Sequence, residues 1–288
     1  MNYNIRLPKR KLYRSFFASF LFSWPIFIWI IILTSLISLA GFILFSFAPA
    51  LADYFALVPL KVINGENLWT LITHIFFHAN IFHLFVNMFS LFFIGSITET
   101  LIGRKRFFSF YIFAGLSAGV FFVLLAKLGS AFGGKWLQVL GDLNIAGVGA
   151  SGALFGLIGI LAILIPRKKV YLIVGPIILI ILQVLLPNWI SGAFLAVLDV
   201  ALNILLFAMI FSLFLPNPRL RKLALPIEMP LWIAPIVAII PLVAISFYVS
   251  LPIGNSAHFG GLIAGLIYGI YLRLKYPKRV SLIEKYLR

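Results

Sequence analysis

The chain has 288 residues, of which 63% are hydrophobic and only 10% are charged. Soluble domains carry about 45–50% apolar and about 25% charged residues, so this composition excludes an ordinary water-soluble protein and predicts that the bilayer is its solvent. The net charge of +16 does not indicate a nucleic-acid partner, because the basic residues form short clusters between apolar runs. Without any Cys, a disulfide framework, a Cys-ligated metal and a thiol nucleophile are all excluded.

Eight apolar runs are long enough to be predicted as helical spans, which makes the chain an all-α polytopic membrane protein. The first run is too long for the apolar region of a cleaved signal peptide, so we expect it to be retained. In chain order the predicted spans are Trp24–Phe47, His83–Ile102, Phe107–Leu128, Val148–Ile165, Val170–Leu186, Trp189–Leu215, Leu231–Ser250 and Ser256–Leu274.

Five basic clusters lie between or beyond these runs and predict the topology. If eight spans alternate, all five clusters fall on one side of the membrane, as the positive-inside rule requires, and both termini are cytoplasmic. The opposite, outer side then receives the segment Ala48–Phe82, which is too apolar for a free loop and is expected to pack on the helices. The clusters are Met1–Arg14, Arg104–Arg106, Arg167–Lys169, Arg219–Lys222 and Arg273–Arg288.

All four histidines of the chain lie in two short stretches, and three of them lie in "THIFFHANIFHLFVN". His83 and Asn87 are four residues apart, so on a helix both side chains project from one face. Polar groups clustered in a bilayer predict a functional site, although His74 or His78 alone could instead anchor a helix end at the interface. A metal site is disfavoured, because neither an H-E-x-x-H motif nor an acidic third ligand accompanies the histidines.

A run of small residues, "GVGASGALFGLIG", opens the fourth predicted span with Gly149, Ser151 and Gly152. At a helix N-terminus, free backbone N–H groups can hold an anion beside an exposed Ser. Such runs also serve helix packing in membranes, which is the alternative interpretation of this motif.

His258 begins the last predicted span, and Gly261, Gly265 and Gly269 follow it on one helix face. Such a face permits unusually close contact with another glycine-bearing helix, and the span that begins near Ser151 offers one. This packing would bring His258 within hydrogen-bond range of Ser151.

Three motifs in order resemble the signature of the rhomboid family. They are His78-x4-His83-x3-Asn87, then Gly149-Ala150-Ser151-Gly152, then Ala257-His258-x2-Gly261-x3-Gly265. Trp69 and Glu99 also fall where that family has a Trp and a Glu, and the resemblance covers about Trp24 to Leu274 apart from one insertion. The family commonly has Trp-Arg where this chain has Trp69-Thr70, so no role of that Arg can be transferred.

The resemblance implies a rhomboid-like core of six helices, and the chain exceeds that core in one place. Ser151 and His258 are 107 positions apart, whereas a single intervening span would need about half of that. The excess predicts an inserted helical hairpin over Val170–Leu215, which raises the count to eight spans with Trp189 on the outer face. The family-like pattern resumes at Pro226–Pro235. We therefore expect a protease domain over residues 23–274 that includes the hairpin at 170–215, and basic cytoplasmic tails at 1–22 and 275–288.

The activity that the resemblance implies is a serine endopeptidase with a Ser-His dyad, which cuts transmembrane helices near the outer leaflet. Ser151 would be the nucleophile and His258 its base, oriented by stacking on Phe155 in place of a carboxylate. Apart from Glu99, near the inner end of the second span, Asp199 is the only acid predicted inside a span. It is expected to pair with a neighbour such as Asn203. The oxyanion would be held by the Ser151 N–H, His83 and Asn87, with His78 and Gly149 as supporting residues.

No metal or other cofactor is expected, and the expected partners are transmembrane protein substrates and membrane lipid. The expected location is the plasma membrane. One alternative function is a catalytically silent rhomboid-like protein that binds or escorts membrane clients, although such proteins lack the Ser or the His. A transporter or channel is another, but the polar residues gather at one membrane face instead of tracing a path across it.

Overall fold

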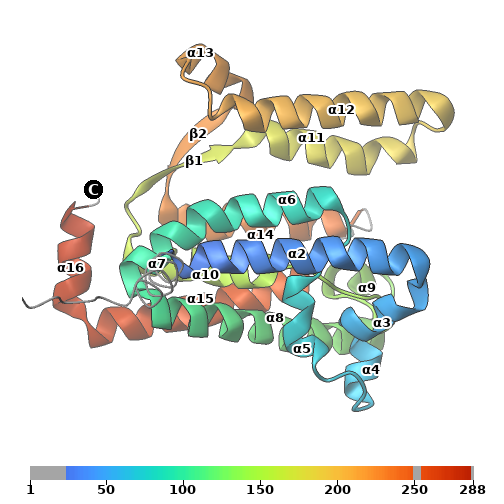
Figure 1. Ribbon diagram of the computed structural model, residues 1–288, viewed down its shortest axis with the longest axis horizontal. Helices are drawn as coiled ribbons and strands as arrows, with labels where there is room; N and C mark the ends of the chain where they lie inside the picture. Colours follow the sequence, from blue (N-terminus) through green and yellow to red (C-terminus); the bar gives the residue numbers. More distant parts are fainter. Residues whose placement is uncertain (1–23, 249–253, 287–288) are drawn as a thin grey trace, which may run out of the picture.

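The computed structural model describes residues 24–248 and 254–286, and it is a bundle of roughly parallel and antiparallel helices (Figure 1). The predicted tail at 1–22 lies outside these residues. The longer helices are α2 (Ile26–Phe47), α6 (Ile81–Ser90), α8 (Arg104–Phe132), α10 (Ser151–Leu164), α11 (Val174–Leu185), α12 (Gly192–Ser212), α14 (Ala234–Ser246), α15 (Asn255–Lys275) and α16 (Pro277–Tyr286).

Shorter elements connect the long helices. They are η1 (Pro49–Leu51), α3 (Ala52–Phe55), α4 (Pro59–Ile63), α5 (Thr70–Thr73), η2 (His74–Phe76), η3 (Leu91–Gly95), α7 (Ser96–Ile102), α9 (Lys135–Leu140), η4 (Leu186–Asn188), α13 (Pro218–Arg221), η5 (Lys222–Ala224) and η6 (Leu231–Ile233), with strands β1 (Lys169–Ile173) and β2 (Pro226–Pro230).

Five described helices are long and apolar enough to cross a membrane: α2, the continuous helix α6–η3–α7, α8, α12 and α15. Three shorter apolar helices cover Ser151–Leu164, Val174–Gln183 and Leu231–Ser246. Each predicted span thus coincides with an apolar helix, and the helix ends differ by a few residues. The last four residues of the predicted span Leu231–Ser250 lie beyond α14, and the final two of them are outside the described part.

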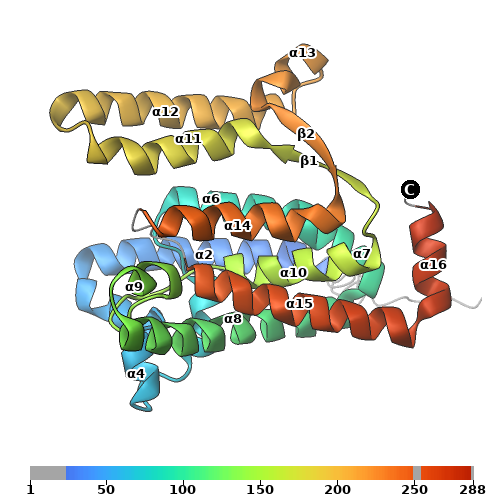
Figure 2. The same cartoon turned by 180° about the vertical axis from the view of Figure 1, so that it is seen from behind.

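The α10 helix is the centre of the bundle. Its sequence has no polar stripe, and nearly all of its side chains are buried, as expected for a helix that is surrounded by others. It packs against α15 and α8, and Figure 2 shows α10 and α15 side by side. Together with α8, which contributes the fully buried Phe107 and Tyr111, α10 forms the main hydrophobic core.

The bundle has two chemically different ends. One end, here called the basic end, carries the basic clusters at the start of α8, after α10, after α12 and from the end of α15 onward. The other end carries the start of α10 and is here called the Ser151 end; α3 and α9 lie there, whereas α7 and α16 lie at the basic end (Figure 1). The segment after α2 folds into short helices at the Ser151 end, and α4 and α5 pack on α8, as the sequence predicts.

Glu99 ties the start of α2 to the basic end. Its two carboxylate oxygens accept hydrogen bonds from the backbone N–H groups of Ile26 at 2.9 Å and Phe27 at 2.8 Å. The N–H groups of a first helical turn have no partners within the helix, and the positive end of the helix dipole favours an anion there. The buried carboxylate therefore caps α2 from another helix, with Arg104 as its ion-pair partner at 3.5 Å.

The prediction of an all-α fold is wrong where the insertion joins the rest of the bundle. Residues Lys169–Ile173, part of which is predicted as the start of a helical span, instead form strand β1, which pairs antiparallel with β2. Pro226 and Pro230 lie at the ends of β2, where Pro is tolerated in an edge strand but disfavours a helix. The partly exposed ion pair between Lys169 and Glu228 joins the two strands at 2.8 Å.

Helices α11 and α12 form an antiparallel hairpin along one side of the bundle (Figures 1 and 2). The hairpin contacts α6 through a small apolar cluster in which Leu206 and Ile210 of α12 meet Phe82 and Phe89 of α6. The edge-to-face contact of Phe82 with Phe207, with ring centroids 6.0 Å apart, extends this cluster. The predicted tail after residue 274 begins with the helix α16 in the part that the structure describes.

Candidate active site

Ser151 and His258 meet at the Ser151 end of α10 and α15. The Nε2 atom of His258 lies 2.8 Å from the Ser151 hydroxyl oxygen, so the two side chains form a hydrogen bond across 107 positions of sequence. The His258 ring is buried and stacks on Phe155, with centroids 4.2 Å apart and an angle of 9° between the rings. Phe155 lies one turn after Ser151 on α10 and thus orients the ring towards the serine.

The contact depends on the absence of side chains between α10 and α15. A Cβ atom on Gly261 would overlap the carbonyl oxygen of Gly152, and one on Gly265 would overlap that of Gly156. Backbone therefore touches backbone along this seam, as small residues allow in membrane helices. The glycine spacing is the reason that α15 places His258 beside Ser151.

Within the described residues, the Nδ1 atom of His258 is buried and has no hydrogen-bond partner. Asp199 lies on the hairpin, where its carboxylate accepts a hydrogen bond from Asn203 Nδ2 at 3.3 Å, the pairing expected from the sequence. Gln183 also donates to it, at 3.1 Å. Among the described residues the site is therefore a pair, Ser151 and His258, and the imidazole is positioned by stacking on Phe155.

His83 lies against the backbone just before Ser151. Gly149 has a φ of +126°, and a Cβ atom there would come within 2.8 Å of His83 Cε1. Glycine is thus required at 149 both for its conformation and for the approach of the ring. Because α10 begins at Ser151, the Ser151 N–H belongs to a first turn without intrahelical acceptors.

Asn87 lies one turn after His83 on α6, and the helix is started by Asn80, whose side chain accepts from the His83 N–H at 2.8 Å. The Asn87 side chain is buried, and its Nδ2 donates to the His83 carbonyl oxygen at 2.9 Å. An amide nitrogen carries two N–H donors, so this bond fixes the group and leaves one donor for another acceptor.

His78 also contacts the backbone that precedes Ser151. Its Nε2 accepts from the Ala150 N–H at 3.4 Å, and its Nδ1 lies 2.9 Å from the Ser38 hydroxyl. Burial lowers the pKa of His78 to about 3, so the ring is neutral and one nitrogen must donate while the other accepts. Since Nε2 accepts, Nδ1 donates to Ser38, whose hydroxyl donates in turn to the Phe76 carbonyl oxygen at 2.9 Å.

Sequence reasoning missed Ser38 and assigned no position to His74. Ser38 and Thr34 are buried polar residues four apart on the mostly apolar α2, a signal that indicates a polar contact inside a bundle. His74 is buried, and its carbonyl oxygen accepts from the Gly149 N–H at 2.9 Å. The described residues contain no group of three or more His, Asp or Glu that could hold a metal ion.

Comparison with known proteins gives a consistent result. Residues 65–205 and 202–275 match the family model described as "Rhomboid domain". The chain is 34% identical to "Rhomboid protein 1, mitochondrial" of Saccharomyces cerevisiae over 104 residues, which are 35% of this chain and 27% of the relative. It is 36% identical over 101 residues to "Putative rhomboid protease YdcA" of Bacillus subtilis, covering 35% of this chain and 43% of the relative.

A third relative carries a different description. "Inactive RHOMBOID-like protein 8" of Arabidopsis thaliana is 29% identical over 96 residues, which are 33% of this chain and 23% of the relative. In all three comparisons the match spans less than half the length of the relative.

Proposed function

The chain belongs to the rhomboid family, a family of multi-pass integral membrane proteins, and from that premise we propose that it is an intramembrane serine endopeptidase. Ser151 is the nucleophile and His258 its general base. The observation that carries the proposal is the 2.8 Å hydrogen bond between these two side chains at the glycine seam. The similar proteins include one named as a putative protease and one named as inactive, so the proposal rests on the residues of the site.

The proposed reaction is acyl transfer to the serine. His258 Nε2 takes the hydroxyl proton as the Ser151 oxygen attacks a backbone carbonyl of the substrate, and the imidazolium then gives that proton to the leaving amine. Water attacks the resulting acyl-enzyme, with His258 again as base. A neutral imidazole is needed for the first step, because a protonated Nε2 cannot accept the hydroxyl proton.

The oxyanion forms at the start of α10 in this mechanism. The Ser151 N–H, the His83 ring and the remaining Asn87 N–H are its proposed donors, and the His78–Ala150 contact holds the chain that carries the first of them. Gly149 allows His83 to approach. Donors that are fixed before reaction stabilise the developing charge without reorganisation.

The proposed substrates are membrane-spanning helices that unwind near the Ser151 end, because only extended backbone can enter such a site. We further propose that the basic end faces the cytoplasm and that the protein lies in the plasma membrane with both termini inside. In this scheme residues 23–274 are the protease domain, residues 170–215 are an inserted hairpin that raises the span count to eight, and residues 1–22 and 275–288 are tails.

A fluorophosphonate probe tests the proposal directly. The purified protein in detergent should be labelled on Ser151, and Ser151→Ala and His258→Ala should each abolish labelling and cleavage of single-span helices while the thermal unfolding profile stays unchanged. A folded protein that neither reacts with the probe nor cleaves any helix would favour the second candidate, a silent protein that binds membrane clients. That candidate is raised by the relative named as inactive.

A further inference from the structure

Asp199 is an acidic residue inside an apolar helix. The α12 helix has a mean hydropathy of 2.5, and Asp199 lies seven residues from its first residue, about 10 Å along the axis. An ionisable side chain at membrane depth is costly, and its partner identifies its function.

The Asp199 carboxylate is held in place, but its charge is not compensated. Gln183 Nε2 donates to one oxygen at 3.1 Å and Asn203 Nδ2 to the other at 3.3 Å, and both donors are neutral amides. The four ion pairs within the described residues do not include Asp199. A carboxylate can accept about four hydrogen bonds, so these two contacts orient the group and leave capacity for a cation.

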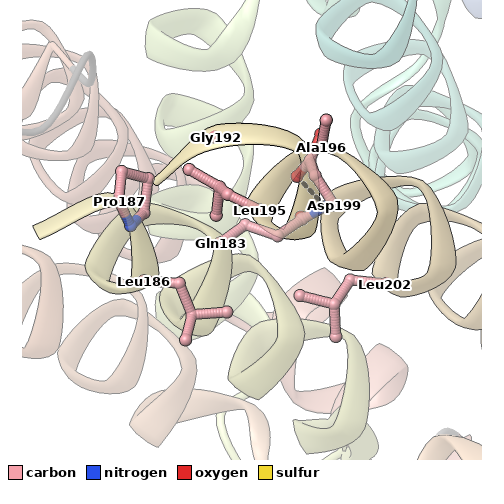
Figure 3. A pocket seen from close by; sticks show the side chains of 8 residues that line it. All are labelled: Gln183, Leu186, Pro187, Gly192, Leu195, Ala196, Asp199 and Leu202. Atoms are coloured by element: carbon pink, nitrogen blue, oxygen red, sulfur yellow. Dashed lines mark hydrogen bonds between the residues drawn. The ribbon is translucent and has the colours of Figure 1, made fainter. Parts of the chain in front are cut away.

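Asp199 lines a pocket of about 410 Å³ between the Ser151-end turns of α11 and α12 (Figure 3). Gln183 bridges towards the carboxylate, and the apolar part of the lining consists of Leu186, Leu195 and Leu202 with Pro187 and Ala196. Apolar walls beside one anionic group suit a Lys or Arg side chain, whose aliphatic stem is buried while its charged head pairs.

The pocket lies further towards the Ser151 end than the contact between α12 and α6. Phe207, which contacts Phe82 of α6, is eight residues after Asp199 on α12, so Asp199 lies about 12 Å further towards the Ser151 end. Phe82 is adjacent in sequence to His83 at the start of α6. A substrate chain bound at Ser151 that continued outward past the start of α6 would reach the level of the pocket.

We propose that this pocket binds a basic side chain of the substrate, located in the segment that flanks the scissile bond on the Ser151 side. The inference rests on the proposed protease function and adds a substrate class to it: membrane-spanning helices with a Lys or Arg on that flank. The hairpin is then a second binding element, whose carboxylate selects substrates that the dyad alone would cleave without preference.

The test uses the full chain in liposomes and a panel of single-span helices that differ at one flank position, with Lys, Leu or Glu placed at each successive position. Wild type should cleave the Lys helices with kcat/KM about 10-fold above the Leu helices at one or two adjacent positions, through a lower KM. Asp199→Asn should remove this difference, so that this variant cleaves the Lys and Leu helices with equal kcat/KM. Asp199→Lys should transfer the preference to Glu, and Asp53→Asn is the matched control at an exposed acid outside the hairpin.

The cleavage assay distinguishes failure of this inference from failure of the proposed protease function. Equal cleavage of Lys and Leu helices at every position by wild type would overturn the inference and leave the protease function intact. An equal loss on all helices in Asp199→Asn would assign Asp199 a structural role and also overturn it. Self-association in liposomes that Asp199→Asn abolishes would make a second copy the occupant instead. If wild type cleaves no helix and does not react with a fluorophosphonate, the proposed function itself fails.

Discussion

Adding one methyl group at the glycine seam should separate the dyad without altering either of its residues. In Gly261→Ala the new Cβ would occupy the space of the Gly152 carbonyl oxygen. Non-bonded heavy atoms pack about 3.5 Å apart, so α15 must move from α10 by about 1 Å or more. The Ser151–His258 contact of 2.8 Å would then exceed hydrogen-bond range. A misplacement of about 1 Å can cost about 10²-fold in rate, equivalent to about 2.7 kcal/mol of transition-state stabilisation.

Two measurements separate this effect from simple unfolding. Overpacking costs about 1–3 kcal/mol, so Gly261→Ala should lower the thermal midpoint in detergent yet remain folded, while kcat and the rate of fluorophosphonate labelling fall together by about 10²-fold. Gly254→Ala is the matched control, because its Cβ would make only an ordinary 3.5 Å contact with Ala257. Wild-type labelling by a folded Gly261→Ala protein would refute the argument that the seam sets the dyad distance.

Three further changes test other contacts. Asn87→Ala should lower kcat by about 10²–10³-fold with little change in KM, because one oxyanion donor is lost; a change confined to KM would contradict that role. Glu99→Gln should destabilise the protein by about 0.5–2 kcal/mol in thermal unfolding, since it weakens the cap on Ile26 and Phe27, whereas the exposed control Glu66→Gln should not. Asn188→Cys in this Cys-free chain should react with a membrane-impermeant maleimide from outside. Labelling only after permeabilisation would rule out a hairpin that crosses the membrane.

The contact between Ser151 and His258 was predictable because glycines spaced four apart form one helix face that allows close packing against another helix. Gly261 and Gly265 lie one turn apart, and only backbone on the facing helix can fill the space that they leave. The stacking of Phe155 on the His258 ring follows from the same register, since Phe155 is one turn from Ser151. Helical periodicity, which a sequence displays, determines which of these residues share a helix face.

The contacts that the sequence did not predict depend on how separate segments meet. Ser38 lies on α2 and His78 in the connection to α6, and nothing in their spacing reports the 2.9 Å contact between them. The pairing of β1 with β2 is likewise invisible, because the partners are far apart in the chain and the intervening hairpin separates them. The apolar run that follows the basic cluster at Arg167–Lys169 predicts the start of a helix. It forms a strand because it pairs with the distant, Pro-containing strand β2.

The β1–β2 ribbon also makes the insertion a module. Because Lys169 pairs with Pro230, the chain leaves the core and returns to it at neighbouring points. A segment whose two ends adjoin can be lengthened, shortened or exchanged with little effect on the spacing of the helices on either side. Here those helices are α10 and α14, so recombination at the ribbon would give the same helical bundle a different membrane-facing attachment.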